Sequence, residues 1–179
     1  LFRSNRPEAP TRATEILMEM ISKSKEDGNE NFRPYGMIYA TVMGAHARRG
    51  KVEEVVEVWN VMRNDFLSGN VEDVKAEVIA YNILIDAWSN SENQSAPVEA
   101  ESLLNEMIDL YAKGELKQGP DAVTYNSVIN CWSKSNRPEA PQRALGVLQM
   151  MMTEFKENGN EDIRPDAITY TSVMDAYAR

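Results

Sequence analysis

The chain has 179 residues, of which 42% are hydrophobic and 26% charged, and its formal net charge is −9. This composition is typical of a soluble globular protein with a sizeable core, and no stretch approaches the ~18 apolar residues of a membrane span. The single cysteine, Cys131, excludes an internal disulfide framework. The negative net charge argues against loose nucleic-acid binding driven by charge alone.

The sequence repeats itself at a long offset. Residues 4–10, with the sequence SNRPEAP, recur unchanged as residues 135–141, which is an offset of 131. Two further copies lie between these, so that equivalent tyrosines are separated by 42, 44 and 45 residues. The tyrosines of the four copies are Tyr39, Tyr81, Tyr125 and Tyr170. Internal repeats of this length are typical of solenoids and related arrays.

The first element of each copy carries an apolar stripe with helical spacing. Around Tyr125 the stripe continues through Val128, Ile129 and Trp132, positions that share one face of a helix. In the earliest of these copies His46 takes the place of the tryptophan. We call this element helix A and expect it over residues 36–49, 78–90, 122–134 and 167–179.

The second element of each copy, helix B, has a stripe of its own. In one copy it runs through Ala144, Val147, Leu148 and Met151. Prolines, which a first helical turn tolerates, mark its start at Pro10, Pro97 and Pro141. Glycines that can form a left-handed cap follow it at Gly28, Gly69, Gly114 and Gly159. In the copy that starts near residue 36, the turn between the helices shortens to Arg49-Gly50-Lys51.

A single pair of helices cannot bury both stripes, so neighbouring pairs must stack. The expected fold is all-α: a right-handed α-solenoid of stacked antiparallel helix–turn–helix repeats. The array covers residues 1–179, and its repeats are 1–35 (incomplete), 36–77, 78–121, 122–166 and 167–179 (incomplete). Because the chain starts and stops inside a helix A, we expect it to be a segment of a longer array.

These stripes and their flanking residues resemble the pentatricopeptide repeat family. Residues 120–130 (PDAVTYNSVIN) and 165–171 (PDAITYT) are similar to its Pro-Asp-x-Val-Thr-Tyr-Asn-x-Leu-Ile signature, and residues 100–107 are similar to its helix-B pattern. The repeats are longer than is usual in the family, and the chain is acidic. The resemblance implies binding of single-stranded RNA, one base per repeat, in RNA processing, stability or translation in a mitochondrion or plastid. It implies no cofactor, no small-molecule substrate and no membrane association.

The resemblance also implies which side chains read the bases. With the tyrosine counted as fourth in each repeat, the reading pairs at the fifth and last positions are Asn82 with Asp121 and Asn126 with Asp166. An amide offers a donor and an acceptor to one edge of uracil, and the carboxylate can orient it, so the family's pairing favours U. Repeat 36–77 has Ala40 with Glu77 and should read nothing well, whereas Thr171 would favour a purine.

Other positions of the family pattern serve the faces of the bases and the phosphates. Aliphatic residues at the second position would sandwich the bases: Met37, Ile79, Val123 and Ile168. The thirteenth position would contact phosphates and is basic at Arg3, Arg48, Lys134 and Arg179, with Asn90 as the exception. The helix-A segments carry a net charge of +2, which leaves −11 for helix B and the turns. Helix-B glutamates such as Glu101 are therefore expected to face outward, away from the RNA.

Simpler interpretations of the same residues remain open. Asp121 and Asp166 directly precede a helix A, so each is either an N-cap alone or an N-cap that also helps to read a base. Neither has Glu or Gln three residues later, so no capping box is expected. Lys134 and Arg179 can also be ordinary solvated charges. The tyrosine, tryptophan and methionine stripes, together with His46, are expected to be core.

No residues suggest catalysis or metal binding, and we expect the chain not to be an enzyme. The single histidine, His46, and Cys131 belong to different repeats and form neither a nucleophile–base pair nor a zinc site. The hypothesis is therefore an RNA-binding solenoid whose helices A line the groove. The alternative is a scaffold that binds protein partners, as a subunit of an organellar ribosome or another assembly, because acidic solenoids commonly meet basic partners.

Overall fold

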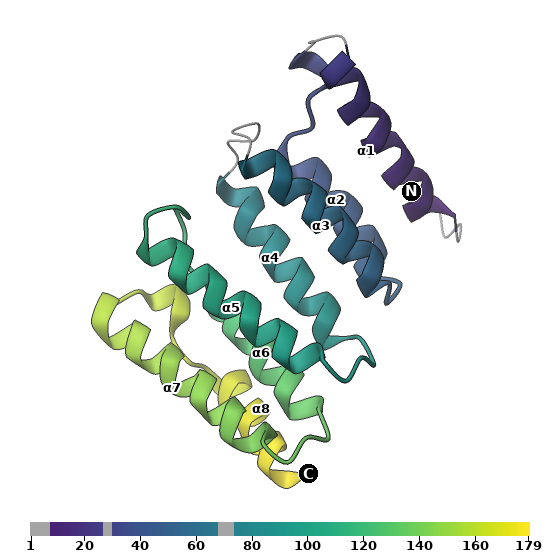
Figure 1. The fold of residues 1–179 in the computed structure, drawn as a ribbon. Coiled ribbons are helices and arrows are strands. Elements are labelled where there is room, and N and C mark those ends of the chain that lie inside the picture. The colour runs from purple at the N-terminus through teal and green to yellow at the C-terminus, as the bar shows by residue number, and fades with distance from the viewer. Residues whose placement is uncertain (1–7, 27–29, 68–73) are drawn as a thin grey trace. The chain divides into compact units, whose positions relative to one another are not determined.

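The computed structural model describes residues 8–26, 30–67 and 74–179, and over these residues it contains helices and no strand. The helices are α1 (Ala9–Glu26), η1 (Glu30–Phe32), α2 (Gly36–Ala47), α3 (Val52–Leu67), α4 (Val74–Ser89), α5 (Ala96–Ala112), α6 (Ala122–Lys134), α7 (Ala140–Asn158), η2 (Glu161–Ile163) and α8 (Ala167–Ala178) (Figure 1). The chain divides inside α4 into two compact units, Leu1–Ile83 and Leu84–Arg179, which are described separately.

The first unit contains one complete pair of helices. Helix α2 packs against α1 on one side and against α3 on the other. The turn from α2 to α3 is tight, and Gly50 adopts a left-handed conformation with φ of 65°, which a residue with a Cβ rarely adopts. The backbone N–H of Lys51 donates to the carbonyl of His46 at 3.2 Å and closes the turn. The short turn predicted for repeat 36–77 is confirmed.

The second unit repeats this arrangement. Helix α6 packs against α5, α7 and α8, and α7 also packs against α8 (Figure 1). A proline is the second residue of α1, α5 and α7, and the left-handed glycines Gly114 and Gly159 follow α5 and α7 as predicted. Gly28 and Gly69 lie outside the described residues. The all-α class and the helical-pair repeats are confirmed, whereas the repeat boundaries and the handedness of the array stay predictions.

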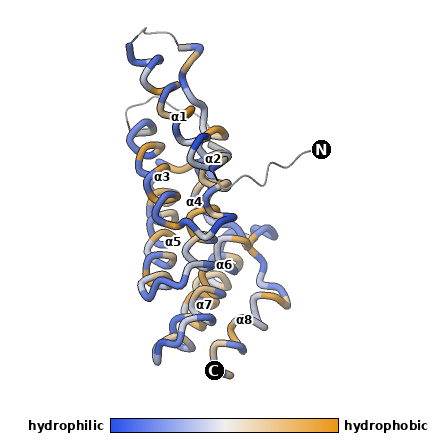
Figure 2. Tube along the Cα trace, turned by 90° about the vertical axis from the view of Figure 1, so that its right-hand side faces the viewer, coloured by the Kyte–Doolittle hydropathy of each residue, from blue (hydrophilic) through white to orange (hydrophobic). Residues whose placement is uncertain are grey.

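The two predicted stripes meet in the core. Tyr125, Ile129 and Trp132 of α6 are at most 2% exposed, as are Val147 and Met151 of α7. Hydrophobic and hydrophilic residues alternate in short runs along the helices, as expected when one face is buried (Figure 2). Burial of this apolar area stabilises each helix pair.

Buried tyrosines of helix A interact with acids on helix B. The hydroxyl of Tyr39 in α2 donates a hydrogen bond to the Asp65 carboxylate in α3. Burial, and then this bond, raises the pKa of Tyr39. In the second unit burial raises the pKa of Tyr125 to about 12, with a further contribution from Glu154. The stripes of α2 and α6 can therefore bury a tyrosine, because its polar tip meets an acid or lies near one.

A buried polar cluster joins three helices of the second unit. Glu101 of α5 is 7% exposed and accepts a hydrogen bond from Trp132 Nε1 at 2.7 Å. Arg143 of α7 donates to the same carboxylate at 2.6 and 3.1 Å. The expectation that Glu101 faces outward is therefore wrong. The buried indole N–H requires an acceptor, and the guanidinium compensates the charge of the carboxylate.

His46 occupies the same place in the first unit as Trp132 does in the second. It is 5% exposed, and its Nε2 lies 2.8 Å from Thr14 Oγ1 in α1. Thr14 and Glu101 are equivalent positions of helix B, so both units use the same cross-helix contact. The expected core position of His46 is confirmed, and burial is the main cause that lowers its pKa.

The stripe of α8 differs from the others. Tyr170, Met174 and Tyr177 are 45%, 61% and 55% exposed, so the expectation that they are core is wrong. The equivalent stripe of α6 is covered by α7. Within the described residues no helix B follows α8, so only its side toward α6 and α7 is buried.

Helix α4 begins at Val74, four residues before the predicted start at residue 78. Prolines precede the other helices A, at Pro34, Pro120 and Pro165, but Ala76 takes their place here. Proline disfavours the helical conformation in the residue before it. Without it the helix extends toward the N-terminus, and Glu77 lies inside α4 rather than at its start.

Met107→Ala tests the packing of helix B. Met107 of α5 is 0% exposed, so the variant should lose about 2–4 kcal/mol of unfolding free energy in urea denaturation. Met174→Ala is the matched control, because Met174 is 61% exposed and should change stability by less than ~0.5 kcal/mol. Equal losses in the two variants would contradict this description of the core.

His46 gives a second prediction, on pH. Since its folded pKa lies below 6.5, the neutral form stabilises the folded state, and this contribution is lost as the pH falls below the unfolded pKa. The urea midpoint should therefore fall between about pH 7 and about pH 5.5. His46→Gln cannot titrate and should lack this component. An unchanged pH dependence in the variant would show that His46 does not contribute.

Candidate nucleic-acid interface

The second position of each helix A holds an exposed aliphatic side chain. The exposed fractions are 40% for Met37, 38% for Ile79, 59% for Val123 and 65% for Ile168. By contrast, Tyr125, two residues after Val123, is 1% exposed. The stripe occupies the buried face of the helix, so the second position must point away from it. These four predicted sandwich residues are therefore accessible to a ligand.

The reading residue Asn126 has an unusual environment in α6. Its side-chain Oδ1 is buried and has no hydrogen-bond partner. A buried acceptor without a partner costs about 1–3 kcal/mol. If the amide rotated outward, Oδ1 would no longer be buried without a partner. A ligand with an N–H donor could then form a hydrogen bond with Oδ1 and stabilise the rotated side chain. Asn82 is half-buried in α4 and belongs to the other unit.

Asp121 and Asp166 are N-caps, and both form capping boxes. Asp121 Oδ1 accepts from the backbone N–H and the hydroxyl of Thr124, both at 2.9 Å, and Thr124 Oγ1 accepts from the Asp121 backbone N–H at 3.1 Å. Asp166 and Thr169 repeat these bonds. The expectation of no capping box is wrong, because a threonine hydroxyl can replace Glu or Gln at this position.

The cap also affects the electrostatics of Asp166. The bonds from the Thr169 backbone N–H, and then from its hydroxyl, lower the pKa of this exposed carboxyl. The cap bonds use Oδ1. The structure thus assigns a capping role to both aspartates and leaves the predicted reading role as a separate, additional one.

Side chains at the thirteenth position lie at the end of helix A. Lys134 is exposed, and its Nζ lies 3.4 Å from Asn90 Oδ1, the same position of the preceding repeat. Arg48 caps the C-terminus of α2 and is exposed, as is Arg179 after α8. Arg3 lies outside the described residues. The Lys134–Asn90 contact shows that thirteenth positions of consecutive repeats can meet along one edge.

Some predicted groups fall within one unit and others do not. The second unit holds Val123 and Asn126 on α6 and Asp166 and Ile168 at the start of α8. The hydroxyl of Thr171 donates to the Ala167 carbonyl at 2.7 Å, inside its own helix. Asn82 with Asp121, and Ile79 with Val123, involve both units. Their pairing therefore stays a prediction from the sequence.

Two further properties of the described residues bear on the class of site. Among the described residues, no group of three or more His, Cys, Asp or Glu side chains is placed to hold a metal ion. In the same part of the chain, every helix is too short or too polar to cross a membrane.

The helices define an all-α helical repeat protein. The family model of the PPR repeat, the pentatricopeptide repeat, matches residues 37–65 and 123–154. The first match covers most of α2 and α3, and the second covers α6 and most of α7. These two segments therefore match the pentatricopeptide repeat, a helical repeat that is typical of RNA-binding proteins. A search of curated proteins gave no match.

Substitutions at Asp121 test the capping role. Asp121→Ala removes the cap bonds to Thr124 and should destabilise the chain by about 1 kcal/mol in urea denaturation. Asp121→Ser is the matched variant, because serine caps a helix about as well as aspartate, and it should stay within ~0.5 kcal/mol of the wild type. A serine variant as unstable as the alanine variant would show that the carboxylate has a structural role beyond the cap.

Proposed function

We propose that this chain binds single-stranded RNA along its helices A, one base per repeat, and prefers uracil at two repeats. The observation that carries the proposal is the exposed aliphatic side chain at the same position of each helix A, next to helix-A stripes that are buried in α2 and α6. A surface of this kind suits the faces of bases. The matched PPR repeats support the same partner.

Within the second unit, the repeat 122–166 supplies the elements of one base site. Val123 and Ile168 would contact the two faces of the base, and this packing would contribute about 1 kcal/mol per base. Asn126 would bond its edge, and Asp166 would orient the amide. The unpartnered Oδ1 of Asn126 favours a ligand with an N–H donor, and uracil supplies one at N3.

Repeat 78–121 would read a second uracil through Asn82 and Asp121, and Ile79 and Val123 would hold its base. Repeat 36–77 would accept any base, since Ala40 has no hydrogen-bonding side chain. Thr171 would favour a purine. Arg3, Arg48, Lys134 and Arg179 would contact phosphates. The proposal includes a role in RNA processing, stability or translation in a mitochondrion or plastid, where proteins of this family typically act.

Titration of short U-rich and A-rich RNAs tests the proposal. Asn126→Ala should reduce the preference for U roughly tenfold, because it removes the groups that contact the base edge. Asn158→Ala is the matched control: it makes the same change at an exposed asparagine at the end of α7. Asp166→Ser retains a capping hydroxyl but not the carboxylate, so it should lower base preference while stability is kept.

The outcomes separate the proposal from its alternative. Equal affinity of the wild-type chain for U-rich and A-rich RNA would exclude base reading. Absence of RNA binding at low salt would instead favour the protein-interaction scaffold, which the net charge of −9 makes the second candidate. In that case basic protein partners should bind the wild-type chain, and neither Asn126→Ala nor Asp166→Ser should change their affinity.

A further inference from the structure

The residue three places after the thirteenth position of a repeat has the same charge as the residue at the thirteenth position itself. The sequence includes both positions in four copies: in three of them both residues are basic, and in one both are asparagine. The pairs are Arg3 with Arg6, Arg48 with Lys51, Asn90 with Asn93, and Lys134 with Arg137. Arg3 and Arg6 lie outside the described residues. This joint change indicates that the two positions serve one purpose.

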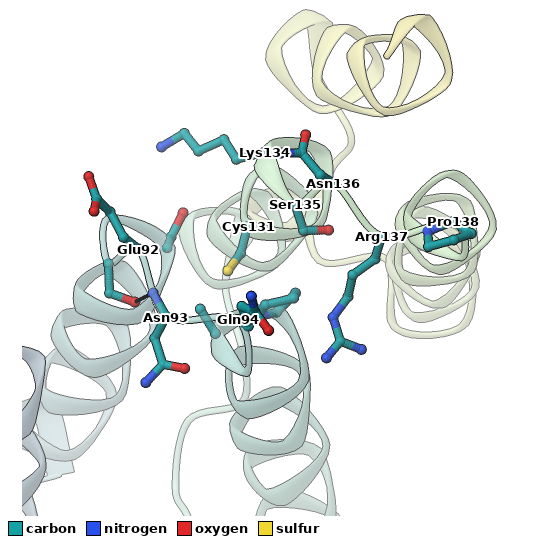
Figure 3. A pocket seen from close by; sticks show the side chains of 13 residues that line it. Glu92, Asn93, Gln94, Cys131, Lys134, Ser135, Asn136, Arg137 and Pro138 are labelled. Atoms are coloured by element: carbon teal, nitrogen blue, oxygen red, sulfur yellow. Dashed lines mark hydrogen bonds between the residues drawn. The ribbon is translucent and has the colours of Figure 1, made fainter.

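In the second unit these positions meet at a pocket. The pocket has a volume of about 450 Å³ and lies between the turn that follows α4 and the turn that follows α6. Lys134, Arg137 and Asn93 line it, and Cys131 lies at its inner side (Figure 3). Lys134 extends to the upper left of Cys131 and Arg137 to its lower right, so the two cations do not touch each other (Figure 3). We call this space the turn pocket.

The lining of the turn pocket suits an anion. Its charged residues are Lys134, Arg137 and Glu92, a net charge of +1 in a chain of net charge −9. Glu92 is exposed, and the other polar lining residues are neutral: hydroxyls, amides and the Cys131 thiol. These neutral groups include hydrogen-bond donors for oxyanion oxygens.

Both cations can take an anion at little cost. Arg137 forms an ion pair with Glu139 at 2.9 Å, but both side chains are more than a third exposed, and such pairs contribute little. Lys134 contacts the neutral amide of Asn90. A guanidinium can bind two phosphate oxygens at once, and this geometry is stronger than its exposed pair with a carboxylate.

We propose that the turn pocket holds a phosphate of the bound RNA, gripped by Lys134 from the end of α6 and by Arg137 from the extended turn. Lys51 would play the part of Arg137 beside Arg48 in the first unit. The inference rests on the proposed function, because the thirteenth position is the expected phosphate contact. What is new is a second cation, three residues later, beside each basic thirteenth position. Repeat 78–121 has the neutral residues Asn90 and Asn93 at these positions, so it lacks a pair of cations that could bind a phosphate.

The test is the salt dependence of RNA binding by the full chain. Arg137→Gln and Lys51→Gln should each reduce the slope of log affinity against log salt by about 0.7, and together by about 1.4. Each should weaken binding roughly three- to tenfold at low salt, with base preference unchanged. Lys156→Gln, an exposed charge near the end of α7, is the matched control and should leave the slope unchanged.

Two gain-of-function variants sharpen the test. Asn90→Lys combined with Asn93→Arg gives repeat 78–121 the missing basic pair and should steepen the slope. Glu139→Gln removes the competing partner of Arg137 and should strengthen binding severalfold. Thermal unfolding of the Gln variants should match the wild type, since these side chains are at the surface. Asn93→Arg should lower the midpoint slightly, because Asn93 Oδ1 accepts from the backbone N–H and the hydroxyl of Ser95.

Single neutral methylphosphonate linkages in the RNA locate the contact. At one linkage the wild type should lose more affinity than Arg137→Gln does, because in that variant only Lys134 remains to interact with the charge of the phosphate. Suppose that the wild type binds RNA with a preference for U, but that log affinity falls with log salt equally steeply in Arg137→Gln and in Lys156→Gln. The phosphate site in the turn pocket would then be excluded, and the proposed function would stand. A wild-type chain that binds no RNA overturns both.

Discussion

The packing of a helix-A stripe against the helix B that follows it determines where the other groups of the chain lie. Once Tyr125 and Trp132 are buried in the core, the rotation of α6 is fixed. The second position must then point to solvent, and Val123 is 59% exposed for this reason. Lys134, at the end of the same helix, is also held at the surface. The candidate RNA face is thus a geometric consequence of the core.

Several groups of the candidate interface have a structural role that does not depend on RNA. Asp121 and Asp166 cap α6 and α8, so their presence is explained by helix stability alone. Arg48 and Lys134 lie at helix C-termini, where a cation interacts favourably with the helix dipole. Asn126 is different, because its buried acceptor is a cost to the free chain and not a gain. It therefore carries more weight as a ligand contact.

The acidic side chains of the chain are placed where they have little effect on RNA binding by helices A. Glu101 is buried and compensated by Arg143, so it contributes little field at the surface. Other helix-B acids, such as Glu99, are exposed on helices that alternate with helices A. Exposed charges beyond a Debye length of about 8 Å are largely screened at physiological salt. Local cations at the ends of helices A can therefore act on phosphates despite the net charge of −9.

The sequence alone determined the helices, their order and their buried stripes, because apolar spacing follows helix geometry directly and each copy repeats the signal. It also placed the exposed second position, since the face opposite a buried stripe is known once the stripe is known. Only the tertiary structure decided the contacts between distant side chains: the acceptor for Trp132, the second half of each capping box, and the exposure of Tyr170 on α8. These depend on which helix lies opposite and on the directions of individual polar atoms, which spacing along one helix does not encode.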